Sequence, residues 1–536
     1  MRMPAFPREP RRGRSRAVFV LRICLLLTSS DRAASAGVTI ITHGLNGDTD
    51  GWVTGMANQI PNYERFVGTN YSTYHVYFFY SGGSYYLTAT RDAGSEPLSP
   101  ESGEIILKLD WRQLADGNSY NTYQVASAVV PALLSTNFIS ELGGHALGEL
   151  PIHVIGHSRG GSLACELSRQ LGTNGIWIDH LTTLDPHPLN NDGFNDFLYS
   201  AVDAPARTYV NVLFHDNYWQ TLNLFVYGES VAGAYVRKLG NLDGGYGGLT
   251  GSHSDVHLWY HATLDWRTPA NDTEASVTSS ERQNWWTAYE NQGSLAGFYY
   301  SLIGGGDRTS TNRPVGPGYA AIRDGFNQWW DLGAGTSNNR TALPTNNGNW
   351  PNLVKFNRTT TNQVAQGETM PVTFCYQWAR SNTELATLSI YLDDDLNPLN
   401  TNQSLIGQIP VPGTGASFMG RAATNLTIFA SNATPGLHAV LAKITADGRT
   451  RYLYAPELVQ VIPTRQPPAL DLAMVDSTQY RIGVNGLPGQ TVVLQFSTNL
   501  QTWSDLATNT LVTNRWEFMD VPSGDPGTRY YRGVLP

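Results

Sequence analysis

Two hydrophobic patterns alternate along the first half of the chain: short apolar runs and stretches with four-residue spacing. Val38–Thr42 and Ile152–Ile155 are largely continuous apolar runs, which are typical of strands buried on both faces. Leu163, Leu167 and Leu171 recur every four residues and predict a helix with an apolar face. Strands that alternate with such helices indicate a mostly parallel sheet with helices on both faces. We therefore expect an α/β fold for this half of the chain.

Further elements are predicted between and after these runs. Asn121 or Thr122 can begin a helix that Pro131 should kink. Additional strands are expected at His75–Tyr80, at Ile105–Trp111, before Asp185 and at Tyr209–Phe214. In parallel sheets, functional groups collect at the carboxyl ends of the strands. The polar residues that follow such predicted ends are His43, Ser158 and Asp185.

From about Lys355 onward, the pattern changes to alternating strand segments separated by turns. The alternating segments Val372–Trp378, Leu388–Leu392, His438–Ile444 and Tyr452–Leu458 predict a β-sandwich. Pro463, Pro467 and Pro468 indicate a linker before a small C-terminal β module. The expected organisation is a signal peptide at 1–36, an α/β domain at 37–354, an Ig-like sandwich at 355–462, a linker at 463–468 and a small β-sandwich at 469–536.

The turn after Ile152–Ile155 carries the sequence Gly156-His157-Ser158-Arg159-Gly160. A serine between a strand and a helix, with a glycine two residues away on each side, is typical of a nucleophile elbow. The glycines let strand and helix approach closely while the serine takes a strained backbone conformation. A serine hydroxyl is an effective nucleophile only when a base accepts its proton and a third group orients that base. The alternative interpretation is a structural Gly-rich turn.

Two aspartates and two histidines are candidates for the partners of Ser158. Asp185 ends the first strand after the Ser158 helix, and Asp216 ends the next strand. His253 lies just before a predicted helix, from which it can approach the serine. His257 lies within that helix, where packing or surface hydrogen bonding is the usual role. We favour Asp185 as the acid and His253 as the base, and keep Asp216 and His257 as alternates.

Five short segments occur in the order His43-Gly44-Leu45, Leu109-Asp110-Trp111, Gly156 to Gly161, Leu184 to Pro188, and His253 to Tyr260. In this order they resemble the lipase branch of the α/β-hydrolases, particularly the pancreatic and lipoprotein lipase group. The resemblance implies an α/β-hydrolase fold and a triad of Ser158, His253 and Asp185. It also implies an oxyanion hole formed by the backbone amides of Leu45 and Arg159. The fourth segment departs from the family pattern by one residue, and the disulfides of the family are absent.

The N-terminal region has the features of a secretory signal peptide. Six arginines among residues 1–16 precede a mostly apolar stretch and the small-residue site Ala34-Ser35-Ala36, which predicts cleavage after Ala36 and a secreted or cell-surface location. The apolar stretch is too short to span a membrane. Removal of residues 1–36 leaves 27 basic and 42 acidic residues, a formal charge of −15. This charge argues against nucleic acid or an anionic membrane as a partner.

Cysteines and acidic clusters add little chemistry to this interpretation. We expect Cys165 and Cys375 to be buried apolar residues, and no Cys/His cluster indicates a metal site or a cofactor. Asp393-Asp394-Asp395 predicts either a solvated turn, which we favour, or a calcium site.

The leading hypothesis is a secreted serine hydrolase of lipase or esterase type, which cleaves ester or lipid substrates through an acyl-enzyme intermediate. One alternative is an acyl hydrolase that acts on polymer or carbohydrate esters. The other is a surface adhesion or carbohydrate-binding protein with an inactive hydrolase domain. The expected ligand of the C-terminal modules is a polysaccharide or a cell-surface group.

Overall fold

A computed structural model describes most of the chain. The described residues are 36–63, 70–99, 102–193, 196–223, 225–264, 275–278, 280–281, 285, 297–304, 340–344, 348, 350–358, 363–415, 419–456, 458–464, 467–476, 478–522 and 528–536. The expected signal peptide lies outside them apart from Ala36.

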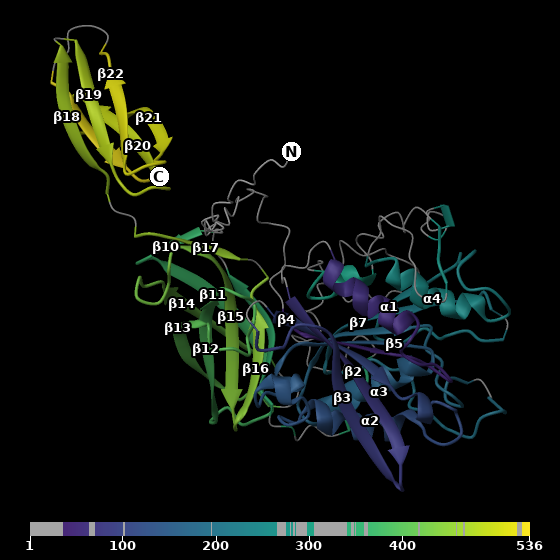
Figure 1. Ribbon diagram of the computed structural model, residues 1–536. Coiled ribbons are helices and arrows are strands. Elements are labelled where there is room, and N and C mark those ends of the chain that lie inside the picture. The colour runs from purple at the N-terminus through teal and green to yellow at the C-terminus, as the bar shows by residue number, and fades with distance from the viewer. Residues whose placement is uncertain are drawn as a thin grey trace, which may run out of the picture.

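One eight-stranded sheet lies at the centre of the first half of the chain (Figure 1). Its strand order is β3-β2-β4-β1-β5-β6-β7-β8, and all neighbouring strands are parallel except β2 and β3. The strands are β1 (Val38–Thr42), β2 (Asn70–Ser81), β3 (Ser84–Gly94), β4 (Ser102–Asp110), β5 (Ile152–His157), β6 (Ile178–Leu184), β7 (Val212–Trp219) and β8 (Tyr235–Lys238). The fully buried strands β1, β5 and β6 form its middle, as expected for continuous apolar runs.

In the described part of the chain, four named α-helices lie against this sheet in two pairs. They are α1 (Trp52–Gln59), α2 (Thr122–Leu133), α3 (Arg159–Thr173) and α4 (Gly251–His261). Short 3-10 helices occur at Ile60–Asn62, Arg112–Leu114, Ser140–Leu142, Leu147–Glu149 and Gly297–Tyr300. Ile40 belongs to the core that holds α2 and α3, whereas Ile41 belongs to the core that holds α1 and α4. Because successive residues of a strand point to opposite faces, the two pairs cover opposite faces of the sheet.

The expected α/β-hydrolase fold class is wrong for this protein. Twenty-three strands accompany only four α-helices in the described residues, so the protein is mostly β. The eight-stranded sheet is itself mixed, and nearly all strand pairs outside it are antiparallel. The physical reason is that helical spacing persists over only four stretches, of 8 to 15 residues. The clear helical pattern of α3 does not continue in most of the chain, so it does not indicate the fold class of the whole protein.

A long hairpin at the edge of the sheet was largely missed. The sequence predicted only a strand at His75–Tyr80, but β2 and β3 form a ladder from Ser72 to Gly94 around a turn at Gly82 and Gly83. Both glycines have positive φ, 58° and 87°, which glycine adopts without strain. β3 alternates between exposed and half-buried positions, so its pattern lacks the buried residues that identify a strand.

Residues 352–462 form two sheets that share one core, which confirms the predicted β-sandwich architecture. One sheet has the order β10-β17-β15-β12-β13 with β16 beside β15, and the other has the order β14-β11-β9. The strands are β9 (Asn352–Arg358), β10 (Gln363–Ala365), β11 (Thr369–Gln377), β12 (Leu385–Asp393), β13 (Ser404–Pro412), β14 (Gly420–Thr427), β15 (Gly436–Ala446), β16 (Arg449–Tyr454) and β17 (Val459–Ile462).

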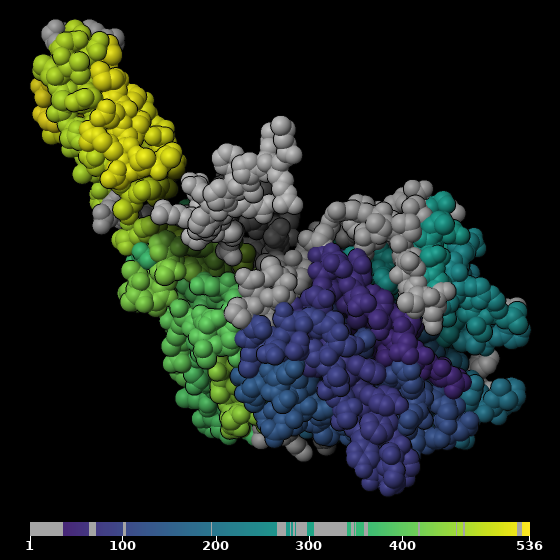
Figure 2. All heavy atoms as spheres, in the orientation of Figure 1, coloured from purple at the N-terminus to yellow at the C-terminus, as the bar shows by residue number. Residues whose placement is uncertain are grey.

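The C-terminal unit consists of two three-stranded sheets, β18-β19-β22 and β21-β20-β23. Its strands are β18 (Ala469–Asp476), β19 (Gln479–Asn485), β20 (Thr491–Ser497), β21 (Ser504–Thr510), β22 (Arg515–Asp520) and β23 (Tyr530–Val534). Ile482 and Val484 of one sheet pack with Val492 and Leu494 of the other in a separate core. Figure 2 shows this unit, in yellow, projecting away from the rest of the protein.

The sandwich at 352–462 packs against the part of the protein that holds the eight-stranded sheet and shares a hydrophobic core with it (Figure 2). Arg451 of β16 is buried and donates hydrogen bonds of 2.9 and 3.0 Å to the carbonyl oxygens of Gly148 and Trp177. Asn352 of β9 donates to the Gly175 carbonyl oxygen at 2.6 Å and accepts from the Trp177 N–H at 2.9 Å. Within the described residues, no helix has the length and apolar character needed to cross a membrane.

Candidate functional site

Ser158 lies between β5 and α3, at the carboxyl end of a central strand. Its backbone has φ 57° and ψ −126°, a strained conformation for a residue with a side chain. A Cβ on Gly156 would lie 2.1 Å from the Gly160 carbonyl oxygen, and one on Gly160 would lie 2.4 Å from the His43 carbonyl oxygen. Both positions therefore need glycine for the strand, the helix and the loop after β1 to approach this closely.

Asp185 and His253 are hydrogen-bonded to each other. Oδ2 of Asp185, which follows β6, lies 2.6 Å from Nδ1 of His253 in the first turn of α4. Asp185 is fully buried and His253 is 8% exposed. Because Nδ1 faces the carboxylate, Nε2 is the ring nitrogen that can accept a proton from another group.

Three further donors hold the Asp185 carboxylate. The Gln220 backbone N–H and side-chain amide donate at 2.9 and 2.8 Å, and the Gly228 N–H donates at 2.9 Å. A Cβ on Gly228 would lie 2.4 Å from Oδ1 of Asp185, so this position needs glycine. Sequence reasoning missed Gln220 and Gly228 because they lie in an irregular segment without a periodic pattern.

Ser158 and His253 line one cavity of about 250 Å³. Its lining is mainly polar and includes Asn46, Asp48 and Ser254, with Leu45 and Trp52 as the large apolar side chains. Neither the Ser158 hydroxyl nor Nε2 of His253 makes a hydrogen bond in the described part of the chain. Such contacts are often long before substrate binds, so both groups can meet a common ligand here.

The loop after β1 lies beside the Ser158 side chain. A Cβ on Gly44 would lie 2.8 Å from Cβ of Ser158, so the loop that carries Leu45 lies directly against the serine. Among the described hydrogen bonds, none uses the amide N–H of Leu45 or of Arg159. Free amides at such positions can stabilise an oxyanion, and this role of Leu45 and Arg159 stays a prediction.

The Arg159 side chain forms a fully buried ion pair with Asp203. Its Nε and Nη2 atoms lie 2.7 and 2.9 Å from Oδ2 and Oδ1 of Asp203, and Nη2 also donates to the Tyr120 carbonyl oxygen. Asp203 accepts further bonds from the N–H groups of Thr122 at 2.9 Å and Leu189 at 3.2 Å. This network, which the sequence did not predict, fixes the start of α3 to α2 and to the loop after Asp185.

Two neutral histidines surround His253. Burial, and then the neighbouring histidines, hold the pKa of His157 and of His257 well below its usual range. The Nε2–H of His157 donates to the His253 carbonyl oxygen at 2.9 Å, so His157 positions the backbone of His253. The His257 ring stacks on Trp52 with centroids 4.5 Å apart.

The alternate acid is engaged elsewhere. Asp216 lies on β7 and accepts hydrogen bonds from His180 at 2.8 Å, Thr182 at 2.6 Å and Tyr218 at 3.0 Å. The structure therefore brings Asp185, and not Asp216, to His253. The alternate base, His257, lines the Ser158 cavity but contacts Trp52 and His157.

The acidic turn at Asp393–Asp395 has protein partners on each carboxylate. The first aspartate pairs with the Tyr454 hydroxyl, the second with His438, and the third with the Asn400 amide at 2.8 Å. Among the described residues, no group of three His, Cys, Asp or Glu side chains is arranged to hold a metal ion.

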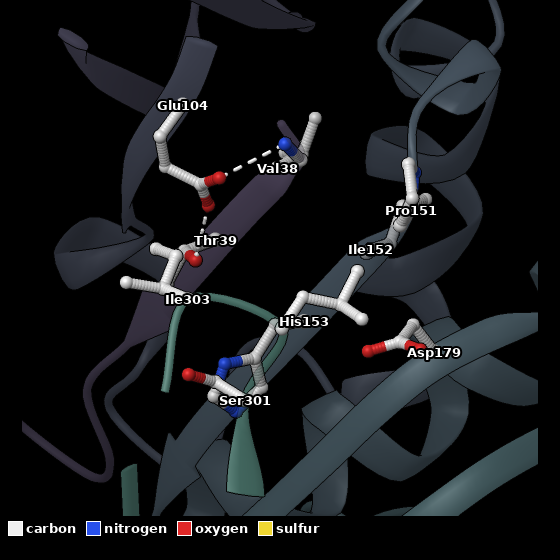
Figure 3. A pocket seen from close by; sticks show the side chains of 11 residues that line it. Val38, Thr39, Glu104, Pro151, Ile152, His153, Asp179, Ser301 and Ile303 are labelled. Carbon is white, nitrogen blue, oxygen red and sulfur yellow. Dashed lines mark hydrogen bonds between the residues drawn. The ribbon is translucent and has the colours of Figure 1, made fainter. Parts of the chain in front are cut away.

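A very small cavity lies at the amino-terminal ends of the central strands, where β1, β4, β5 and β6 begin (Figure 3). There Glu104 accepts hydrogen bonds from the Gly37 N–H at 2.9 Å and the Thr39 hydroxyl at 2.7 Å. Burial raises the pKa of Glu104 to about 7 despite these two bonds. The cavity measures about 10 Å³, room for one water molecule at most, so it does not form a ligand site.

Comparisons with known proteins identify no family for this chain. No protein-family model matches it, and no curated protein matches it. Solved structures that match parts of it include a Salmonella alpha-2-macroglobulin mutant, with 11% identity over 37% of this chain and 17% of that chain and a TM-score of 0.17. Bovine butyrophilin matches with 11% identity over 34% of this chain and 98% of that chain and a TM-score of 0.19. The Pseudomonas fluorescens alkylpurine DNA glycosylase AlkC, bound to DNA, matches with 13% identity over 21% of this chain and 31% of that chain and a TM-score of 0.15. Scores this low support no conclusion about fold or function.

The expected membership of the lipase branch of the α/β-hydrolases is wrong. The protein is mostly β, and no family model supports membership. The five segments that suggested it are each only a few residues long. Short segments of this kind recur on unrelated folds when the same local chemistry is needed, so they identify candidate residues but not a family.

Proposed function

We propose that this protein is a serine hydrolase that cleaves carboxylic esters through an acyl-enzyme intermediate. The observation that carries the proposal is the 2.6 Å hydrogen bond between Asp185 and His253, beside the cavity that His253 shares with Ser158. A serine, a histidine and a carboxylate in these roles occur on several unrelated folds. The proposal therefore rests on the site and not on a family.

Each residue has a defined role in this mechanism. Ser158 Oγ attacks the ester carbonyl while Nε2 of His253 accepts its proton, and the protonated histidine then passes that proton to the leaving alcohol. Asp185 holds the tautomer and orientation of His253 and stabilises its charged form. The amides of Leu45 and Arg159 stabilise the oxyanion, each by about 3 kcal/mol. Water, activated by His253, hydrolyses the acyl-enzyme and restores Ser158.

The lining of the cavity favours short or polar esters over long-chain lipid esters. Asn46, Asp48 and Ser254 offer hydrogen-bonding groups, whereas a long acyl chain would need a continuous apolar wall. Carbohydrate esters and other esters of polar alcohols fit this chemistry.

Hydrolysis of p-nitrophenyl esters of increasing chain length tests the activity and the preference. We expect hydrolysis of the acetate and little of the palmitate. His253→Ala should lower kcat by several orders of magnitude because no base remains, whereas His145→Ala, a partly exposed histidine paired with Glu149, should not. Failure of the folded protein to hydrolyse any ester would favour a binding or adhesion role. A preference for the palmitate would contradict the inference from the polar lining.

A further inference from the structure

Another cavity, larger than the one beside Ser158, opens between the β2–β3 hairpin and α2. It measures about 310 Å³, and we call it the tyrosine groove. The residues that give it its character are Phe78, Tyr85, Tyr120, Tyr123, Gln124 and Ser127. Tyr85 is 46% exposed and Tyr123 is 37% exposed, so aromatic faces are accessible to a ligand. The volume is that of a small-ligand site.

The aromatic rings of the groove are held in place by one another. Tyr85 packs against Phe78 with centroids 5.7 Å apart and edge-on against Tyr120 at 5.2 Å, with an interplanar angle of 86°. Aromatic pairs in such geometry stabilise each other beyond their burial, so the wall is preorganised. This wall lies on β2 and β3, which belong to the eight-stranded sheet, and on the segment before α2.

The polar groups of the groove are uncharged. Among the described residues, no Asp, Glu, Lys, Arg or His side chain lines it. Gln124 accepts the Asn121 N–H at 3.0 Å through Oε1, which leaves its amide NH₂ without a partner among the described residues. The Tyr123 hydroxyl is likewise without a hydrogen bond there. An anionic ligand would find no counter-ion here, so we expect an occupant that is neutral and able to hydrogen-bond.

The combination of aromatic faces with amide and hydroxyl groups suits a sugar ring. A pyranose offers a face of C–H groups that packs on an aromatic ring, while its hydroxyl groups bond to amides and phenols at the edge. An acyl chain would prefer aliphatic walls, but the aliphatic lining is limited to Val125, which is fully buried, and Ala128. A proline-rich peptide is the closest competitor because aromatic grooves also bind such segments.

We infer that the tyrosine groove is a binding site for a neutral carbohydrate chain. It is distinct from the Ser158 cavity, with which it shares no lining residue. The backbone oxygen of Tyr120, in the wall of the groove, accepts a hydrogen bond from Arg159, the residue after Ser158. A chain bound here would therefore contact a segment that is hydrogen-bonded to the residue after the candidate nucleophile. The inference does not require that Ser158 is catalytic.

Affinity gel electrophoresis of the full chain tests this site. The probes are three soluble neutral polysaccharides, arabinoxylan, galactomannan and hydroxyethyl cellulose, with polygalacturonate as an anionic control. The protein carries Ser158→Ala so that no ester on the probe is cleaved. We expect retardation by at least one neutral probe, and a loss of affinity of about tenfold or more in Tyr85→Ala and in Tyr123→Ala. Both tyrosines are exposed, so neither substitution should impair folding.

Tyr86→Ala is the matched control. Tyr86 is the next residue on β3, is 48% exposed and points to the opposite face of the hairpin, where it stacks on Phe79. Its removal should leave binding unchanged. Absence of retardation by all three neutral probes would overturn the inference, as would retardation that survives loss of both groove tyrosines. Binding of a proline-rich peptide in place of any polysaccharide would show that the occupant is a protein segment.

Discussion

Asp185 offers the clearest test at the scale of a single residue. In Asp185→Asn, the side-chain oxygen can still accept from Gln220 and Gly228, but an amide NH₂ then faces Nδ1 of His253. This favours the tautomer whose Nε2 carries the proton and cannot accept one from Ser158. We expect kcat for p-nitrophenyl acetate to decrease by about 10³–10⁴-fold with the fold retained, measured by steady-state kinetics and circular dichroism.

Asp216→Asn is the control for this substitution because Asp216 is also buried but contacts His180 and Thr182 within the sheet. It should lower the free energy of unfolding. The kcat of the folded fraction should stay within roughly a few-fold of the value for the unchanged protein, as is usual for a change remote from the reacting groups. Equal losses of kcat in the two variants would show that Asp185 has no special role.

Glu104 predicts a pH dependence of stability. Burial raises its pKa from 4.5 to about 7, so the folded state keeps a proton that the unfolded state releases between these values. The unfolded state then binds fewer protons, and the stability therefore decreases as the pH rises through this window, by about 3 kcal/mol for this one group. Glu104→Gln retains groups that can bond to Gly37 and Thr39 and should abolish this part of the dependence.

Urea unfolding at pH 4.5 and pH 7 measures the effect of Glu104 as a difference between the two proteins. Burial also raises the pKa values of Glu229 and Asp393 to about 7, but both remain in the variant, so their contributions cancel. The variant should lose less stability than the original protein between the two pH values. A loss of the same size in both would contradict the assignment.

At the scale of single residues, the sequence predicts the candidate catalytic residues but not the residues that hold them by hydrogen bonds. Ser158 was singled out by its glycine neighbours and by the strand and helix patterns around it, signals that all lie between Ile152 and Leu171. Gln220 and Gly228 reach Asp185 across 35 and 43 residues of chain, and nothing in their local sequence records that contact. Long-range hydrogen bonds leave no periodic signal.

Among the elements, the buried ion pair of Arg159 and Asp203 joins α3, α2 and the loop after β6. Asp203→Asn should lower the free energy of unfolding by about 3–5 kcal/mol because it leaves a buried guanidinium without its counter-charge. Chemical denaturation measures this change.

The double variant Arg159→Leu/Asp203→Leu separates the charge from the packing. Replacement of both partners by apolar residues removes the unpaired charge, so the double variant should be more stable than Asp203→Asn. A double variant less stable than the single one would show that the ion pair stabilises through its hydrogen bonds and not merely by neutralising a charge.

The elements also show why the expected fold class was wrong. Helical spacing was clear in α3, and α2 begins at Thr122 with Asn121 as its cap, as predicted. Neither observation limits the number of strands elsewhere. The β2–β3 hairpin was missed because β3 has no buried face, and the order of the strands depends on pairings between distant residues that no local pattern specifies.

For the whole molecule, the two C-terminal units should respond differently to truncation. A chain that ends at Thr464 loses only the unit at 469–536, which has its own core, so its melting temperature and activity should change little. A chain that ends at Trp350 also loses the sandwich, whose Leu441, Tyr452 and Tyr454 belong to the core of the eight-stranded sheet. We expect this shorter chain to aggregate.

Calorimetry and size-exclusion chromatography distinguish these outcomes. A stable, monomeric chain ending at Trp350 would show that the sandwich is an independent domain, as the boundary predicted at 354 assumed. A domain boundary predicted from local sequence patterns does not include this interface, because Arg451 and Asn352 bond to residues more than 170 positions away.

Intact-protein mass spectrometry after treatment with a fluorophosphonate tests the central claim, that Ser158 is a nucleophile activated by His253, most directly. We predict one adduct per chain, located on the peptide that contains Ser158, and its loss in Ser158→Ala and near-complete loss in His253→Ala. The absence of an adduct on the folded protein, or an adduct that persists in Ser158→Ala, would contradict the account.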